Sequence, residues 1–164
     1  MCSSDLLAEL ASLRRLVDIP VAADESIRKD EDPLRVRAAG AADIVMVKVQ
    51  PLGGVRAALR VAEACGLPVV VSSAVDTSVG LAAGVALAAA LPALPYACGL
   101  ATMSLLSGDV TAVPLAEVGG ELPVRRPSVE AGALAQWETD PEPWRQRALA
   151  AAEYLAEAPG KDGW

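Results

Sequence analysis

Short apolar runs recur at a fixed distance along this chain of 164 residues, and each is followed by a polar side chain. The runs and the residues that follow them are 20–23 with Asp24, 44–47 with Lys48, and 68–71 with Ser72. These polar positions are 24 residues apart, twice. Repetition at one distance predicts a structural unit that is used several times along the chain.

Segments with helical patterns lie between these runs. The predicted helices cover about 5–15, 32–37, 55–65 and 81–91, and a fourth predicted strand covers 94–98 and ends at Gly99. Asp32 is expected to cap its helix, and Gly66 to end the next one. Strands that are apolar on both faces and alternate with helices predict an α/β fold with a parallel sheet. Units this short suit a (β/α) barrel, although an open doubly wound sheet also fits.

Functional groups in such a barrel lie at the carboxyl ends of strands, where Asp24, Lys48 and Ser72 are expected. Asp24 and Glu25 offer oxygen ligands that suit a hard cation such as Mg²⁺. Lys48, flanked by valines, suits either a base or a cation held against an anion. An ion pair with Asp24 or Glu25 across neighbouring strands explains Lys48 equally well. The alternative for all these positions is an ordinary polar loop.

Composition narrows the chemistry further. The chain has no histidine, which excludes histidine-based catalysis and histidine metal ligands within it. Its net charge of −7 argues against nucleic-acid binding. Three separated cysteines and an amino terminus without a signal-peptide pattern favour a cytoplasmic setting. The uncharged stretch 77–108 has the length of a membrane span, but Pro92 and Pro95 interrupt it and basic flanking residues are missing, so we expect a buried helix and strand.

The motifs around these positions resemble the enolase superfamily, in its muconate-cycloisomerase-like branch. The resemblance rests on Val-Ala-Ala-Asp-Glu-Ser at 21–26 and Val-Lys-Val-Gln-Pro-Leu-Gly-Gly at 47–54. Further motifs at 72–80 and 94–102 look like those of the o-succinylbenzoate synthases of high-GC Gram-positive bacteria. Members of that family dehydrate 2-succinyl-6-hydroxy-2,4-cyclohexadiene-1-carboxylate to o-succinylbenzoate on the route to menaquinone. The resemblance thus implies a hydro-lyase that uses Mg²⁺ and a small carboxylate substrate.

The resemblance also implies a role for each candidate residue. Asp24 would be a metal ligand at the fifth barrel strand, and Lys48 the catalytic lysine of the sixth, stabilising the intermediate. Ser72 and the backbone near Gly99 would hold the succinyl carboxylate. Glu25 would be a supporting residue that helps to hold the metal or Lys48 in place.

The family's other catalytic groups belong to segments that this sequence does not show. We therefore expect residues 1–125 to form the C-terminal part, about strands 5–8, of an enolase-superfamily barrel, with 126–164 as a tail containing a helix. The N-terminal lid domain and the first half of the barrel are expected to be absent, and the polypeptide alone to be inactive. The missing half of the enzyme is the expected partner; the oligomeric state stays open.

Two other functions fit the same residues. An N-acylamino-acid racemase or dipeptide epimerase of the same superfamily would share Asp24 and Lys48. A non-catalytic half-barrel would act as a binding module and would have to cover its open apolar face. In the tail, 144–157 predicts an amphipathic helix packed on the outside of the barrel, and Gly119-Gly120 a turn in a hairpin over 115–124.

Overall fold

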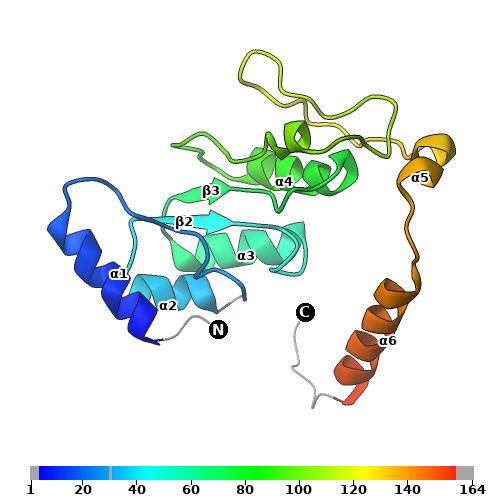
Figure 1. Ribbon diagram of the computed structural model, residues 1–164. Helices are drawn as coiled ribbons and strands as arrows, with labels where there is room; N and C mark the ends of the chain where they lie inside the picture. Colours follow the sequence, from blue (N-terminus) through cyan, green and yellow to red (C-terminus); the bar gives the residue numbers. More distant parts are fainter. Residues whose placement is uncertain (1–3, 30, 158–164) are drawn as a thin grey trace.

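The computed structural model describes residues 4–29 and 31–157. Figure 1 shows α1–α4 gathered around a small sheet, followed by an irregular region and then α5 and α6. The strands are β1 (Ala22–Ala23), β2 (Ile44–Val47) and β3 (Val69–Val71). The helices are α1 (Ser4–Leu16), α2 (Asp32–Ala38), α3 (Val55–Cys65), α4 (Ser78–Ala90), the 3₁₀ helix η1 (Thr102–Leu105), α5 (Ala131–Trp137) and α6 (Glu142–Glu157). The predicted α/β class with alternating strands and helices is confirmed.

The strands form a parallel sheet in the order β1-β2-β3. Val45 of β2 lies opposite Val69 of β3, an offset of 24 residues. Ala22 of β1 lies opposite Ile44 of β2, an offset of only 22 residues. The 24-residue repeat seen in the sequence therefore matches the pairing of β2 with β3. In the pairing of β1 with β2, β1 is shifted by two residues along β2.

The fourth predicted strand is reduced to a single contact. Ser72 and Gly99 form a parallel bridge beside β3, so the chain does return to the predicted edge of the sheet. Residues 94–98, however, form no strand. Pro95 lies in this segment and has no backbone N–H to donate to a strand ladder, which limits pairing there.

Alternation along the strands separates two faces of the sheet. One face packs against the helices, and its strand residues in the core are Ala23, Val45, Val47, Val69 and Val71. The helices contribute side chains such as Val36, Ala58, Val61, Leu81 and Val85 to the same core. The opposite face carries Ala22, Ile44, Met46 and Val70, which do not belong to this core cluster, although Ile44 and Val70 are buried. We call this second side the inner face.

The helix ends show which local signals operate. Gly66 ends α3 in the left-handed conformation, at φ 63°, as predicted. The prediction for Asp32 was wrong: Glu31 precedes α2, and the Asp32 carboxylate instead accepts hydrogen bonds from the backbone N–H groups of Arg28 and Lys29, both at 2.9 Å. Asp32 thus closes the loop before the helix, because its side chain points back along the chain.

The apolar stretch 77–108 contains the expected helix, but the buried strand predicted after it does not form, and residues 92–97 are exposed. α4 buries Leu81, Gly84, Val85 and Leu87, but Ala86, Ala89 and Ala90 are exposed, so the helix is not buried all round as predicted. Among the residues described, no helix is long and apolar enough to cross a membrane.

The carboxyl-terminal region departs most from expectation. α6 forms where a helix was predicted, but every residue of Glu142–Glu157 is exposed, and Figure 1 shows the helix standing away from the sheet. The predicted packing on the outside of the barrel was therefore wrong. Trp144 and Leu155 are 66% and 67% exposed. The helical pattern predicts which side chains share one face of the helix, but it does not predict which part of the molecule covers that face. The turn at Gly119-Gly120 is confirmed, although its hairpin is limited to one bridge between Val118 and Glu121.

Replacing Gly66 by alanine should destabilise the fold. The residue has φ +63°, and an added Cβ would lie 3.1 Å from Arg37 Nη1. We expect Gly66→Ala to lower the free energy of unfolding by about 1 kcal/mol, measured by urea denaturation. Gly132→Ala in α5 is the matched control, since its φ is ordinary and nothing lies within 4 Å of the added Cβ. An equal loss in both variants would contradict the backbone explanation.

Asp43 should make stability depend on pH. Its Oδ1 accepts a hydrogen bond from Arg14 Nε at 2.7 Å and its Oδ2 one from Val21 N at 2.9 Å, which ties α1 and β1 to the start of β2. The Arg14 side chain, followed by the Val21 N–H, holds the pKa of the Asp43 carboxyl below its ordinary value.

A lowered pKa in the folded state gives stability that is present above the ordinary aspartate pKa of about 4 and is lost as the pH falls below it. The difference in unfolding free energy between the wild type and Asp43→Asn should therefore be largest above about pH 5 and shrink on acidification. Denaturation series at several pH values measure it. Asp18→Asn, at an exposed carboxylate between α1 and β1, is the control. A flat difference for Asp43→Asn, or the same pH dependence for both variants, would contradict the prediction.

Candidate active site

The three strand-end residues singled out from the sequence all project from the inner face. Asp24 follows β1, Lys48 follows β2 and Ser72 follows β3. Continuing the observed registers, Lys48 lies level with Ser72, whereas Asp24 lies level with Met46. The three side chains therefore do not form a straight row, but they share one face because each lies an even number of residues from an inner-face position.

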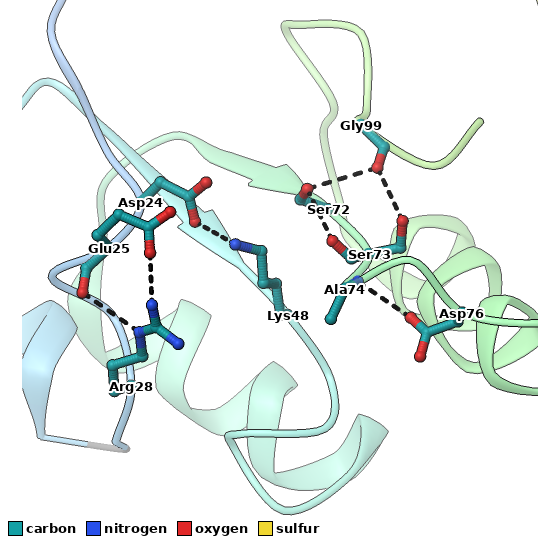
Figure 2. Close-up of polar contacts among 9 residues, drawn as sticks. All are labelled: Asp24, Glu25, Arg28, Lys48, Ser72, Ser73, Ala74, Asp76 and Gly99. Carbon is teal, nitrogen blue, oxygen red and sulfur yellow. Dashed lines mark hydrogen bonds and ion pairs between the residues drawn. The ribbon is translucent and has the colours of Figure 1, made fainter. Parts of the chain in front are cut away.

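The Lys48 side chain spans this two-residue shift between the strand ends and reaches Asp24. Its Nζ lies 2.6 Å from Asp24 Oδ1, and the two side chains are 20% and 37% exposed (Figure 2). The ion pair considered as an alternative explanation for Lys48 is thus present. It is partly open to solvent, so both charged groups remain accessible from the inner face.

Glu25 points elsewhere. Its carboxylate pairs with Arg28 at 2.5 Å, and its side chain is 70% exposed. Figure 2 shows Glu25 and Arg28 facing each other on the side of the loop away from Lys48. The structure therefore brings together Asp24 and Lys48 but leaves Glu25 outside that pair.

Ser72 and Gly99 meet at the end of β3. Gly99 N donates to Val71 O at 2.8 Å, and Ser72 N donates to Val47 O at 2.9 Å, which extends the sheet by one residue on each side. The backbone N–H of Gly99 is therefore used by the fold. The Ser72 hydroxyl lies 3.4 Å from Gly99 O. An added Cβ at Gly99 would lie 3.0 Å from Ser72 Oγ, so a side chain at this position would displace the Ser72 hydroxyl.

Further hydroxyl groups surround this strand end, beyond the residues expected from the sequence. Ser73 Oγ lies 2.6 Å from Thr102 Oγ1 of η1 and 3.3 Å from Gly99 O. The Ser-Ser pair was a visible signal, but Thr102 lies 29 residues away from Ser73 and no local pattern links them.

Val75, in the following loop, has φ 63°, a conformation that a β-branched residue rarely adopts.

A magnesium site is not complete among the described residues. Asp24 offers a carboxylate, the right kind of donor for Mg²⁺, but no group of three or more potential ligands occurs within 4–29 and 31–157. The residues present therefore fit one ligand of such a site and do not fit the whole of it.

A hollow of about 630 Å³ lined by Leu67, Pro68 and Ala93 lies at the amino-terminal end of β3, away from these groups.

Comparison with known proteins places this arrangement in a family. A family model described as "Enolase C-terminal domain-like" matches residues 1–132. An o-succinylbenzoate synthase from Thermobifida fusca is 67% identical over 155 residues, which are 93% of this chain and 49% of the relative. One from Mycobacterium bovis is 54% identical over 145 residues, 88% of this chain and 40% of the relative. The chain thus spans about half or less of the length of the curated relatives it matches.

Solved structures agree with these relatives. The muconate lactonizing enzyme from Pseudomonas fluorescens, in complex with muconolactone, superposes with a TM-score of 0.77 at 28% identity, covering 84% of this chain and 39% of that protein. The 2-chloromuconate cycloisomerase from Rhodococcus opacus gives 0.70 at 29% identity, covering 80% and 38%. The resemblance to the muconate-cycloisomerase-like branch is confirmed, and the chain belongs to the enolase C-terminal domain-like family.

Proposed function

We propose that this chain supplies the Asp24–Lys48 part of the active site of an o-succinylbenzoate synthase. The reaction is the dehydration of 2-succinyl-6-hydroxy-2,4-cyclohexadiene-1-carboxylate to o-succinylbenzoate. The observation that carries the proposal is the pairing of Asp24 with Lys48 at neighbouring strand ends, in a chain 67% identical to a synthase. The relatives are about twice as long as this chain. We expect the rest of the site on the barrel strands of the relatives that this chain does not cover.

Lys48 holds a positive charge above the inner face. A cation fixed in a partly desolvated place lowers the energy of negative charge that develops on a bound carboxylate during proton removal. Asp24 keeps the Lys48 ammonium in position by accepting its hydrogen bond at 2.6 Å. The arrangement suits stabilisation of a small anionic substrate, and the partner strands would supply the base.

Magnesium would bind Asp24 as one of several ligands. When bound, Mg²⁺ would supply positive charge against the substrate carboxylate. Asp24 would then divide its two carboxylate oxygens between Lys48, which is bonded to Oδ1, and the metal. The remaining ligands would have to come from other strands, because the described residues contain one suitable carboxylate at this position and no cluster around it.

Identity favours the synthase over the other functions considered. A racemase or epimerase would use the same Asp24 and Lys48, so these residues do not distinguish the reactions. The two synthases quoted above share 67% and 54% of matched residues with this chain, whereas the muconate lactonizing enzyme shares 28%. A cytoplasmic setting is part of the proposal and agrees with the free thiols of Cys65 and Cys98.

Reconstitution tests the proposal directly. We expect co-expression of this chain with the unmatched amino-terminal segment of the Thermobifida fusca synthase to give a complex that forms o-succinylbenzoate, while this chain alone is inactive. The reason is that a closed barrel brings the separate catalytic groups together. Turnover by the chain alone, or a complex that forms in size-exclusion chromatography but stays inactive, would refute the proposal.

Lys48→Met should lower kcat of the reconstituted enzyme about 100-fold or more, because it removes a fixed charge at nearly constant side-chain length. Lys29→Met, at an exposed lysine of the loop before α2, is the control and should leave kcat unchanged. Steady-state kinetics on both variants measure the effect. Equal activity of Lys48→Met and the wild type would remove Lys48 from the active site.

Removal of metal should expose the role of Asp24. EDTA is expected to abolish turnover of the reconstituted enzyme, and added Mg²⁺ to restore it. Asp24→Asn should raise the Mg²⁺ concentration needed for half-maximal activity at least tenfold, since a neutral amide is a weaker ligand than a carboxylate. Calorimetric titration of the chain alone with Mg²⁺ should show no saturable binding in the micromolar range. Tight binding by the chain alone would contradict an incomplete ligand set.

A further inference from the structure

The end of β3 places two hydroxyl groups near one carbonyl oxygen and a third hydroxyl next to one of them. Gly99 O accepts the backbone N–H of Ser73 at 3.1 Å. The Ser73 hydroxyl lies 3.3 Å from the same oxygen and the Ser72 hydroxyl 3.4 Å from it. Thr102 Oγ1 completes the cluster at 2.6 Å from Ser73 Oγ.

The carbonyl oxygen does not have room for all three donors. It has two lone pairs, and the Ser73 N–H uses one of them. The second lone pair takes either the Ser73 hydroxyl or the Ser72 hydroxyl. The direction of the short bond between Ser73 and Thr102 therefore decides what happens at Ser72.

Thr102 is best placed as the donor of that short bond. A hydroxyl has one proton, and within the described part of the chain Ser73 Oγ is the partner found for the Thr102 hydroxyl. Donation by Thr102 leaves the Ser73 proton for Gly99 O. Ser73 is 8% exposed, so water does not readily take its place in this chain of hydrogen bonds.

The Ser72 hydroxyl then has only long alternatives. Within the described part of the chain it reaches Gly99 O at 3.4 Å and Ser73 O at 3.5 Å, and the Ser73 hydroxyl lies closer to Gly99 O, at 3.3 Å. Its side chain is partly exposed on the inner face, as are those of Asp24 and Lys48. Its proton is thus available to an anionic ligand approaching from that face.

We propose that Ser73 is a positioning residue: by occupying the Gly99 carbonyl, with Thr102 holding it in place, it keeps the Ser72 hydroxyl free to donate to a ligand carboxylate. The identity of the ligand rests on the proposed function; the hydrogen-bond arrangement does not. Without the Ser73 hydroxyl, Ser72 would turn to Gly99 O and its proton would be lost to the ligand.

Carbon-13 NMR of the Gly99 carbonyl in the chain as it is tests the arrangement without any ligand. Ser73→Ala should shift this resonance, and Ser72→Ala alone should leave it nearly unchanged. In the Ser73→Ala background, Ser72→Ala should produce a further clear shift, because Ser72 has by then become the donor. A large shift from Ser72→Ala in the wild-type background would overturn the proposal.

Binding of o-succinylbenzoate to the reconstituted enzyme, measured by calorimetry, tests the consequence. Ser72→Ala and Ser73→Ala should each raise Kd about three- to tenfold, the effect of one hydrogen bond. The double variant should be no weaker than the single ones, since both act through the Ser72 proton. Thr102→Ser keeps the donor and should bind normally. Ser104→Ala, which removes a hydroxyl of η1 that bonds Ala101 O, is the matched control.

The two measurements separate failure of the proposal from failure of the proposed function. Additive losses of affinity, or a normal Kd for Ser73→Ala, would overturn the positioning role. If the reconstituted wild type does not bind o-succinylbenzoate, the proposed function fails, and the carbonyl resonance still decides whether Ser73 occupies Gly99 O.

Discussion

The alternation of side chains along parallel strands is the constraint on which this structure depends. It sends Val45, Val47, Val69 and Val71 to the helices, and it sends the residues between them to the inner face. A shift of β2 by one residue against both neighbours would exchange its two faces and turn Lys48 toward the apolar core. The burial of small aliphatic residues against the helices therefore fixes, indirectly, where the charged groups emerge. Packing on one face and chemistry on the other have the same cause.

The ion pair between Asp24 and Lys48 is compatible with the function proposed for both residues. A partly exposed pair contributes little net stability, because solvent screens the attraction and both side chains lose freedom. With side chains 20% and 37% exposed, this pair holds the Lys48 side chain beside Asp24 and leaves both side chains partly open to solvent. A ligand anion or a metal ion can then compete for one partner at modest cost. The geometry that joins the ends of β1 and β2 is therefore compatible with the proposed binding of a ligand.

Close backbone approach organises the other side of the site. Gly99 brings the returning chain against Ser72, and the carbonyl of Gly99 becomes a shared acceptor for its neighbours. The site thus has a charged part at β1 and β2 and a hydroxyl part at β3, which suits an elongated ligand with anionic groups. α6, by contrast, presents Trp144 and Leu155 to solvent and takes no part in holding these groups.

The sequence alone predicts the central strands, a helix end and the positions of the candidate site, because strand and helix signals are local. The apolar runs predicted β1–β3, Gly66 marked the end of α3, and the polar residues after each strand marked the candidate site. The tertiary structure decided what no local pattern contains. It set the 22-residue offset that places Asp24 two positions earlier along β2 than the repeat predicts, and it joined Ser73 to Thr102 across 29 residues. It also left α6 uncovered. Periodicity fixes the direction of a side chain relative to its own element, whereas register, hydrogen-bond direction and docking depend on the balance of contacts between distant segments.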